Sequence, residues 1–182
     1  MGCDGSGGRE LAQKGTDMEE SARRRWRSLL VWLVVCYGVS AVGGLVTAHA
    51  VETWYQGLTK AALNPPDWVF GPVWTLLYGL MAVAAWLVWI EPEGETRRRG
   101  ILWFCAQLAV NLMWSFVFFG ARMLALAVVD IALLWFLIAV TMVFFFRLRR
   151  AAGWLLVPYL AWVTFAGYLN WAVWMLNPGF GR

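Results

Sequence analysis

Five apolar blocks, each about 20 residues long, constrain the fold more than any other feature of the sequence. Their approximate limits are residues 28–48, 72–90, 101–119, 123–146 and 152–176. Hydrophobic residues make up 61% of the chain and charged residues 14%, against roughly half and a quarter in soluble domains. Because lipid accepts only helices or closed barrels, and barrel strands alternate over about 10 residues, these blocks predict helices. The expected fold class is an all-α membrane protein with a five-transmembrane-helix bundle.

The first 25 residues differ from the rest, because they are polar, glycine-rich and charged. We expect a disordered tail at residues 1–25 and a single five-helix domain at residues 26–182. The start MGCDGS fits an N-myristoylation pattern at Gly2, and Ala48-His49-Ala50 resembles a signal-peptidase site. The apolar stretch before Ala48 is longer than a signal peptide needs, so we expect it to be retained as the first span.

The basic residues are divided unequally between the two ends of such a bundle. The N-terminal side holds 12 of the 15 lysines and arginines: Arg9, Lys14, Arg23, Arg24, Arg25, Arg27, Arg97, Arg98, Arg99, Arg147, Arg149 and Arg150. In a plasma-type membrane, the positive-inside rule then predicts a cytoplasmic N-terminus. The net charge of +4 follows from this topology, so we expect a membrane partner and no nucleic-acid partner.

Reactive side chains are scarce. The three cysteines, Cys3, Cys36 and Cys105, lack a metal-binding or redox spacing. A single histidine does not build a metal cluster, and no set of residues resembles a hydrolase triad or a phosphate loop. The sequence therefore predicts no metal, no cofactor and no dedicated catalytic residues.

The stretch NPPDWVFGPVWTLLY at residues 64–78 places prolines and wide aromatic rings just before an apolar helix. Pro65 and Pro66 favour an extended turn, and Pro72 suits the first turn of a helix. Trp68 fits an anchor at the membrane interface. An interfacial role explains Trp74 poorly, because Trp74 follows inside the helix and faces whatever the preceding loop covers.

This stretch, together with WYQGLTK at 54–60, resembles the TspO/MBR family, which is also called the tryptophan-rich sensory protein, translocator protein or peripheral benzodiazepine receptor family. The resemblance continues in order through QLAVNLMW at 107–114, FFGAR at 118–122, an acid at Asp130 and PYLAWVTFA at 158–166. It implies a five-helix bundle, often dimeric, with a ligand pocket that the first loop covers. A homodimer is therefore expected.

The resemblance and the helical spacing together predict a set of ligand-binding residues. They are Tyr55, Pro65, Trp74, Tyr78, Asn111, Trp114, Trp162 and Ala166. The helix that carries Trp162 and Ala166 sets a large ring beside a small residue, one turn apart, which fits either knob-into-hole packing or a wall for a flat apolar ligand. The family match favours the wall.

Polar and small residues elsewhere in the spans leave alternatives open. Gln107, Asn111 and Ser115 share one helical face, where helix–helix hydrogen bonds and ligand contact are both reasonable. Only Asn111 matches a ligand-contacting position of the family. The small-residue face of Ser40, Gly44 and Ala48 favours close helix packing. Asp130, an acid deep in a span, favours structural pairing over proton relay.

Three functions fit these observations. The first is a sensor or carrier for porphyrins and related tetrapyrroles, bound as ligands and not as cofactors. The second is light-dependent oxidative degradation of a bound porphyrin, with Trp74 and Trp162 as the oxidisable indoles. The third is a scaffold that binds a sterol or another lipid. Ala61 and Leu63 stand where the family has proline and an aromatic residue, which predicts a looser cap. The sterol pattern that ends the animal sequences is absent after Tyr168.

Overall fold

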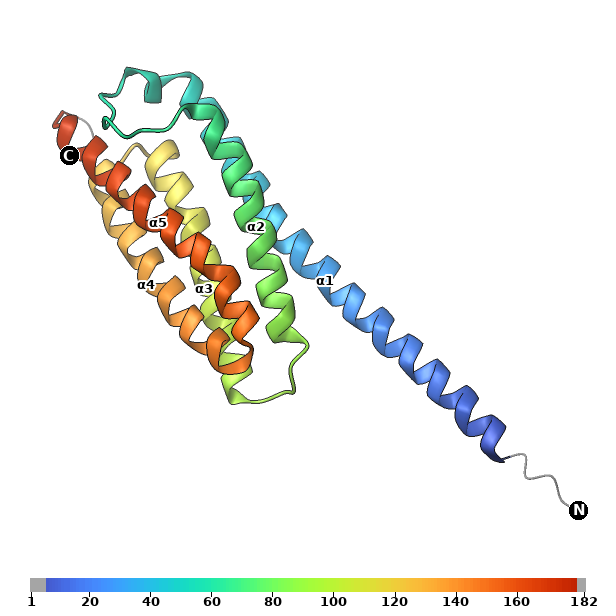
Figure 1. The fold of residues 1–182 in the computed structure, drawn as a ribbon. Coiled ribbons are helices and arrows are strands. Elements are labelled where there is room, and N and C mark those ends of the chain that lie inside the picture. Colours follow the sequence, from blue (N-terminus) through green and yellow to red (C-terminus); the bar gives the residue numbers. More distant parts are fainter. Residues whose placement is uncertain (1–5, 180–182) are drawn as a thin grey trace, which may run out of the picture.

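A computed structural model describes residues 6–179 as a bundle of five helices (Figure 1). The helices are α1 (Ser6–Glu52), α2 (Asp67–Trp89), α3 (Glu95–Ser115), α4 (Leu124–Leu148) and α5 (Arg150–Leu176). Within these described residues, each of the five is long and apolar enough to cross a membrane. The expected fold class, an all-α five-transmembrane-helix bundle, is therefore confirmed.

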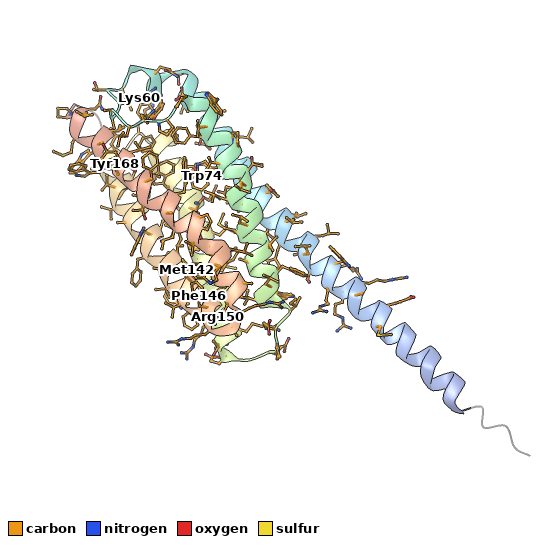
Figure 2. All side chains as sticks on the ribbon, viewed as in Figure 1. Lys60, Trp74, Met142, Phe146, Arg150 and Tyr168 are labelled. Atoms are coloured by element: carbon orange, nitrogen blue, oxygen red, sulfur yellow. The ribbon has the colours of Figure 1, made fainter. Side chains whose placement is uncertain are left out.

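The connections alternate between the two ends of the bundle. The first loop (residues 53–66) and the end of α5 lie at one end, and the α2–α3 and α4–α5 connections lie at the other (Figure 1). Figure 2 shows Lys60 and Arg150 at these opposite ends. The two arginine-rich connections thus lie at the same end of the bundle, as the five-span arrangement predicted. A cytoplasmic location of that end stays a prediction.

Helix α1 begins much earlier than the first apolar block. It starts at Ser6 and projects beyond the bundle toward the N-terminus (Figure 1), so the expected disorder of residues 1–25 is wrong for the part from Ser6 onward. Glutamate, leucine, alanine, glutamine and arginine dominate residues 9–25, and these are good helix formers. The division between this extension and a domain starting at residue 26 stays a prediction. Gly2 and Cys3, which carry the acylation pattern, lie outside the described residues.

The core lies between the helices and is rich in aromatic rings. Phe104 on α3 is fully buried, with its ring stacked on Phe145 at 5.8 Å and edge-on to Trp32 at 5.5 Å between centroids. Aromatic pairs at these distances contribute beyond their buried area. The position of both cysteines inside apolar spans predicts small apolar core residues. This is confirmed for Cys36 on α1, which is buried in the same cluster, and wrong for Cys105, which is exposed on α3.

The outer surface is apolar along the length of the bundle. Exposed side chains include Val34 and Leu45 on α1, Leu126 and Val129 on α4, and Trp154 on α5. Soluble proteins rarely expose an apolar surface of this extent, whereas lipid tails solvate it. The surface that would contact lipid is therefore mainly apolar, and most polar side chains lie in the interior or at the two ends of the bundle.

Candidate functional site

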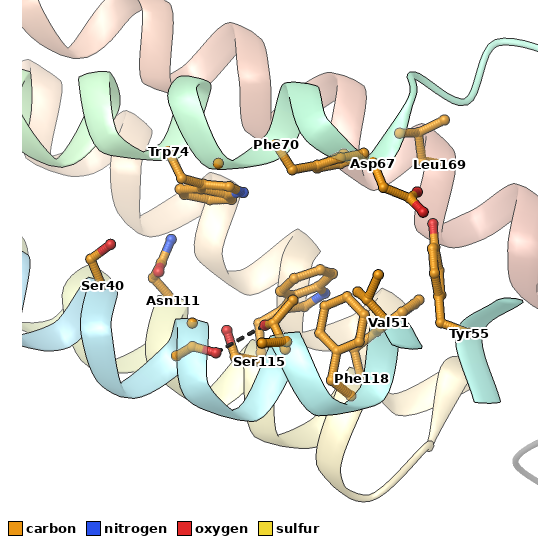
Figure 3. A pocket seen from close by; sticks show the side chains of 18 of the residues that line it. Ser40, Val51, Tyr55, Asp67, Phe70, Trp74, Asn111, Ser115, Phe118 and Leu169 are labelled. Atoms are coloured by element: carbon orange, nitrogen blue, oxygen red, sulfur yellow. Dashed lines mark hydrogen bonds between the residues drawn. The ribbon is translucent and has the colours of Figure 1, made fainter. Parts of the chain in front are cut away.

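A cavity of about 530 Å³ opens between the helices, at the end of the bundle that the first loop covers (Figure 3). Its wall comes from α1, α2, α3 and α5, together with the first loop and the π-helical turn Phe116–Gly120 after α3. Volumes of 300–1,000 Å³ are typical of small-molecule sites. The cavity is therefore large enough for a drug-sized or cofactor-sized molecule.

Most of the predicted ligand-binding residues meet at this cavity. Its wall includes Tyr55, Trp74, Tyr78, Asn111, Trp114, Trp162 and Ala166. Pro65 is not part of the wall. It lies in the turn before α2, where its carbonyl oxygen accepts a hydrogen bond from Asn64 Nδ2 at 3.0 Å. Its rigid ring shapes the path of the first loop, which covers the cavity without bringing Pro65 to it.

Aromatic rings face the cavity from two sides. On α2, the ring of Trp74 lies 5.7 Å from that of Tyr78. On α5, the ring of Trp162 meets Phe70 edge-on at 5.8 Å. A third ring pair, Trp114 stacked on Phe118 at 5.1 Å, closes the side next to the π-helical turn. Such a cavity offers flat, polarisable surfaces to a planar ligand.

A chain of buried hydrogen bonds forms the floor of the cavity. The Tyr78 hydroxyl donates to Asn111 Oδ1 at 2.6 Å, and Asn111 Nδ2 donates to the Tyr159 hydroxyl at 2.9 Å. Tyr159 in turn donates to Gln107 Oε1 at 2.9 Å. Of the two alternatives for Gln107, helix–helix hydrogen bonding or ligand contact, the bond from Tyr159 supports the first. Asn111 combines both alternatives, because it bonds across helices and lines the cavity.

The indole N–H groups of two cavity tryptophans differ. Trp114 Nε1 donates to Asn170 Oδ1 at 2.9 Å, which fixes the ring. The buried Nε1 of Trp162 has no hydrogen-bond partner within residues 6–179. An unmade hydrogen bond at a buried donor costs about 1–3 kcal/mol. A ligand that offers an acceptor to Trp162 would recover that free energy.

The small-residue face of α1 has a different role from the one expected. Ser40, Gly44 and Ala48 all line the cavity, so the interpretation as a close-packing face is wrong. A Cβ placed on Gly44 would meet no atom within 4 Å, whereas one on Gly43 would lie 3.1 Å from the Ser115 hydroxyl oxygen. Gly43 is thus a point of close contact between α1 and α3. The adjacent face of Ser40, Gly44 and Ala48 borders the cavity.

Asp130 does not form the structural pair that we expected. Its buried Oδ2 has no hydrogen-bond partner in the part of the chain that the structure describes. The polar contacts of α4 with α5 involve other residues: Asn170 Nδ2 donates to the Leu124 carbonyl at 3.4 Å, and Trp135 Nε1 donates to Thr164 Oγ1 at 2.9 Å. Asp130 does not line the cavity.

The first loop is fastened to the end of α5 by one amide. The backbone N–H of Thr59 donates to Asn177 Oδ1 at 3.0 Å, and Asn177 Nδ2 donates to the Thr59 carbonyl at 2.9 Å. Two residues on, Ala61 is buried against Leu169 and Ala172 of α5. Leu63, which stands where the family has an aromatic residue, is 66% exposed, and the looser cap stays a prediction.

Several wall residues were missed in the sequence. Phe70 precedes Trp74 by four residues, and Phe118 follows Trp114 by four, so helical spacing could have found both. The same spacing places Asp67 three residues before Phe70 and Thr47 three residues after Gly44, and both line the cavity. The first loop supplies Tyr55, whose phenol pKa rises to about 12, mainly through burial and in part through the nearby charge of Asp67. Tyr55 therefore stays protonated and donates a 3.4 Å hydrogen bond to Asn64 Oδ1.

The fold and the cavity define a class: a multi-pass membrane protein with a capped, aromatic-walled cavity between its helices. A sequence model of the TspO/MBR family matches residues 31–175. The chain belongs to this family.

Individual relatives agree with the family assignment. The tryptophan-rich protein TspO of Chlorobaculum tepidum is 41% identical over 83% of this chain and 96% of its own length. The tryptophan-rich sensory protein of Cereibacter sphaeroides is 39% identical over 84% and 92%. The human translocator protein is 42% identical over 70% and 76%. Bacterial and animal members of the family thus resemble most of this chain.

Proposed function

We propose that the protein binds porphyrins, related tetrapyrroles and similar flat apolar ligands in the capped cavity, as a sensor or carrier in the membrane. The observation that carries this proposal is the pair of indole walls, Trp74 on α2 and Trp162 on α5, which belong to one cavity of about 530 Å³. Planar aromatic ligands stack on such rings. A cavity that is mainly apolar with a few placed polar groups is the usual form of a small-molecule site.

The polar groups of the wall support the same ligand class. Trp162 Nε1 is a buried donor without a partner among residues 6–179, and Asn111 has a second amide hydrogen beyond the one given to Tyr159. Both can donate to acceptors on a ligand. Because these donors are few and the rings are many, the site favours a broad aromatic body with a small number of acceptors.

Filling the cavity should weaken this binding. Ala166 lines the cavity, and Ala161 on the same helix is exposed on the outer surface. We expect saturable quenching of tryptophan fluorescence when protoporphyrin IX is titrated into the detergent-solubilised parent protein. Ala166→Phe should weaken binding about tenfold or more, a loss of at least about 1.4 kcal/mol.

Ala161→Phe is the matched control, because it makes the same substitution on the outer surface and should bind like the parent. Linear quenching that is identical in all three proteins would mean that porphyrin partitions into the detergent. The ligand would then have to be sought among sterols and other lipids.

A second candidate function is light-dependent oxidative degradation of the bound porphyrin. It is favoured by the presence of two oxidisable indoles, Trp74 and Trp162, in the same cavity wall. If either indole takes part in the chemistry, Trp74→Phe or Trp162→Phe should stop product formation under light while leaving most of the binding intact. Absorbance of the porphyrin under illumination and in the dark measures this. Turnover that survives both substitutions would remove the mechanism.

A further inference from the structure

The cavity wall carries a single formal charge within the part of the chain that the structure describes. That charge is Asp67, the first residue of α2. Figure 3 shows Asp67 and Tyr55 pointing toward one another at one end of the cavity, beside the first loop. Gln56 Nε2 in the first loop donates to Asp67 Oδ2 at 3.0 Å, and the Asp67 side chain is exposed. Asp67 therefore stands where the cavity meets water.

Lys60, the cationic residue of the first loop, is not part of the cavity wall. Lys60 Nζ lies 4.5 Å from the ring centroid of Tyr55 and 3.4 Å from Gln56 Oε1, but Lys60 does not line the cavity. Asp67 and Lys60 thus share Gln56 as a neighbour, and only Asp67 faces the interior. The raised pKa of the Tyr55 phenol, to which Asp67 contributes, indicates that the negative field of Asp67 reaches the cavity side of the first loop.

The position of this charge determines which end of a ligand it meets. The rest of the wall is apolar or neutral, so an ionised carboxylate pushed deep into it would lose its hydration without gaining a cation. The acidic groups of an amphiphilic ligand must therefore stay at the mouth. There they meet the carboxylate of Asp67, and like charges a few ångströms apart repel.

We propose that Asp67 is a selectivity residue of the cavity: it disfavours flat ligands whose mouth-facing end carries carboxylates and favours those with a neutral or cationic end. This inference rests on the proposed binding function. Within the proposed ligand class, it predicts that planar molecules with absent or esterified carboxylates bind more tightly than the corresponding free acids. Because Asp67 is exposed, the discrimination is a modest electrostatic effect that salt weakens.

A comparison of two porphyrins tests this selectivity. Protoporphyrin IX and its dimethyl ester share the ring and differ in two carboxylates. The measured quantity is the ratio of their dissociation constants, acid over ester, in the parent and in Asp67→Asn. The amide keeps the shape of the side chain and an acceptor for Gln56. We expect the ratio to fall about fivefold in Asp67→Asn, which corresponds to one like-charge contact in water. In the parent, 0.5 M salt should also lower the acid-over-ester ratio of dissociation constants.

Asp130→Asn is the matched control, because it neutralises an acid that does not line the cavity and should leave the ratio as in the parent. Taking the ratio between variants removes the greater tendency of the ester to enter detergent. If both porphyrins bind saturably and the ratio is the same in parent and Asp67→Asn, the selectivity inference is wrong and the proposed function stands. If neither porphyrin binds saturably, the proposed function fails and this inference fails with it.

Discussion

Replacing Asn177 with alanine is expected to speed the release of bound porphyrin about tenfold or more. Asn177 is only 8% exposed, and its amide makes both hydrogen bonds to the backbone of Thr59. Its removal leaves the N–H and the carbonyl of Thr59 without these partners. Unsatisfied groups of this kind cost about 1–3 kcal/mol, and 1.4 kcal/mol is a tenfold change. The closed first loop loses that free energy, so its open state becomes more populated.

Trypsin detects the same opening without a ligand. The bond between Lys60 and the buried Ala61 is protected while the first loop is closed, so Asn177→Ala should be cut there faster than the parent. Met175→Ala is the control, because Met175 is exposed two residues away on α5 and should behave like the parent. Equal cleavage and equal porphyrin release in parent and Asn177→Ala would show that this amide does not hold the first loop.

Replacing Asn111 with leucine is expected to destabilise the bundle by about 2 kcal/mol. Asn111 is buried between Tyr78 on α2 and Tyr159 on α5. Leucine leaves the Tyr78 hydroxyl without an acceptor and removes one partner of Tyr159. Hydrogen bonds between membrane helices average only about 0.6 kcal/mol, but stranding a buried donor costs about 1–3 kcal/mol.

Unfolding in mixed micelles with increasing denaturing detergent measures this loss. Thr164→Val is the comparison, because on the exposed side of the bundle it breaks one bond between helices, from Trp135 Nε1 to Thr164 Oγ1 at 2.9 Å. It also removes the local bond from Thr164 Oγ1 to the Leu160 carbonyl of the same helix. We expect it to cost about 0.6 kcal/mol. A loss for Asn111→Leu no greater than that of Thr164→Val would mean that the floor of the cavity contributes little to stability.

The helices could be predicted because lipid demands long apolar segments, but their starts could not. The second span was expected from residue 72, whereas α2 begins at Asp67. An acid directly after Pro66 suits a helix N-terminus, where the helix dipole favours negative charge. The third span was expected from residue 101, whereas α3 begins at Glu95, which pairs with Arg98 and Arg99. The first turns of both helices contain charged residues, so hydropathy does not reveal where these helices begin.

The cavity residues could be predicted where they lie on one face of a single helix. Trp74 with Tyr78, and Trp162 with Ala166, are each one turn apart, and in both cases the spacing placed the pair together. The role of Ser40, Gly44 and Ala48 could not be predicted, because small residues permit either contact or space. The neighbouring helix decides which: Gly43 meets Ser115 of α3 closely, whereas a Cβ on the adjacent Gly44 would meet no atom within 4 Å. The lack of a hydrogen-bond partner for Asp130 Oδ2 within residues 6–179 likewise depended on which residues the packing of α4 places beside it.

The central claim is that porphyrin occupies a site in the protein and not the surrounding lipid. The most direct measurement is the amount of protoporphyrin IX bound per chain in lipid vesicles prepared at a low and a high lipid-to-protein ratio, with protein-free vesicles subtracted. One cavity per chain predicts saturation at a single porphyrin per chain, with the same value at both ratios. Bound porphyrin that fails to saturate, or that is lost entirely after subtraction, would contradict the account.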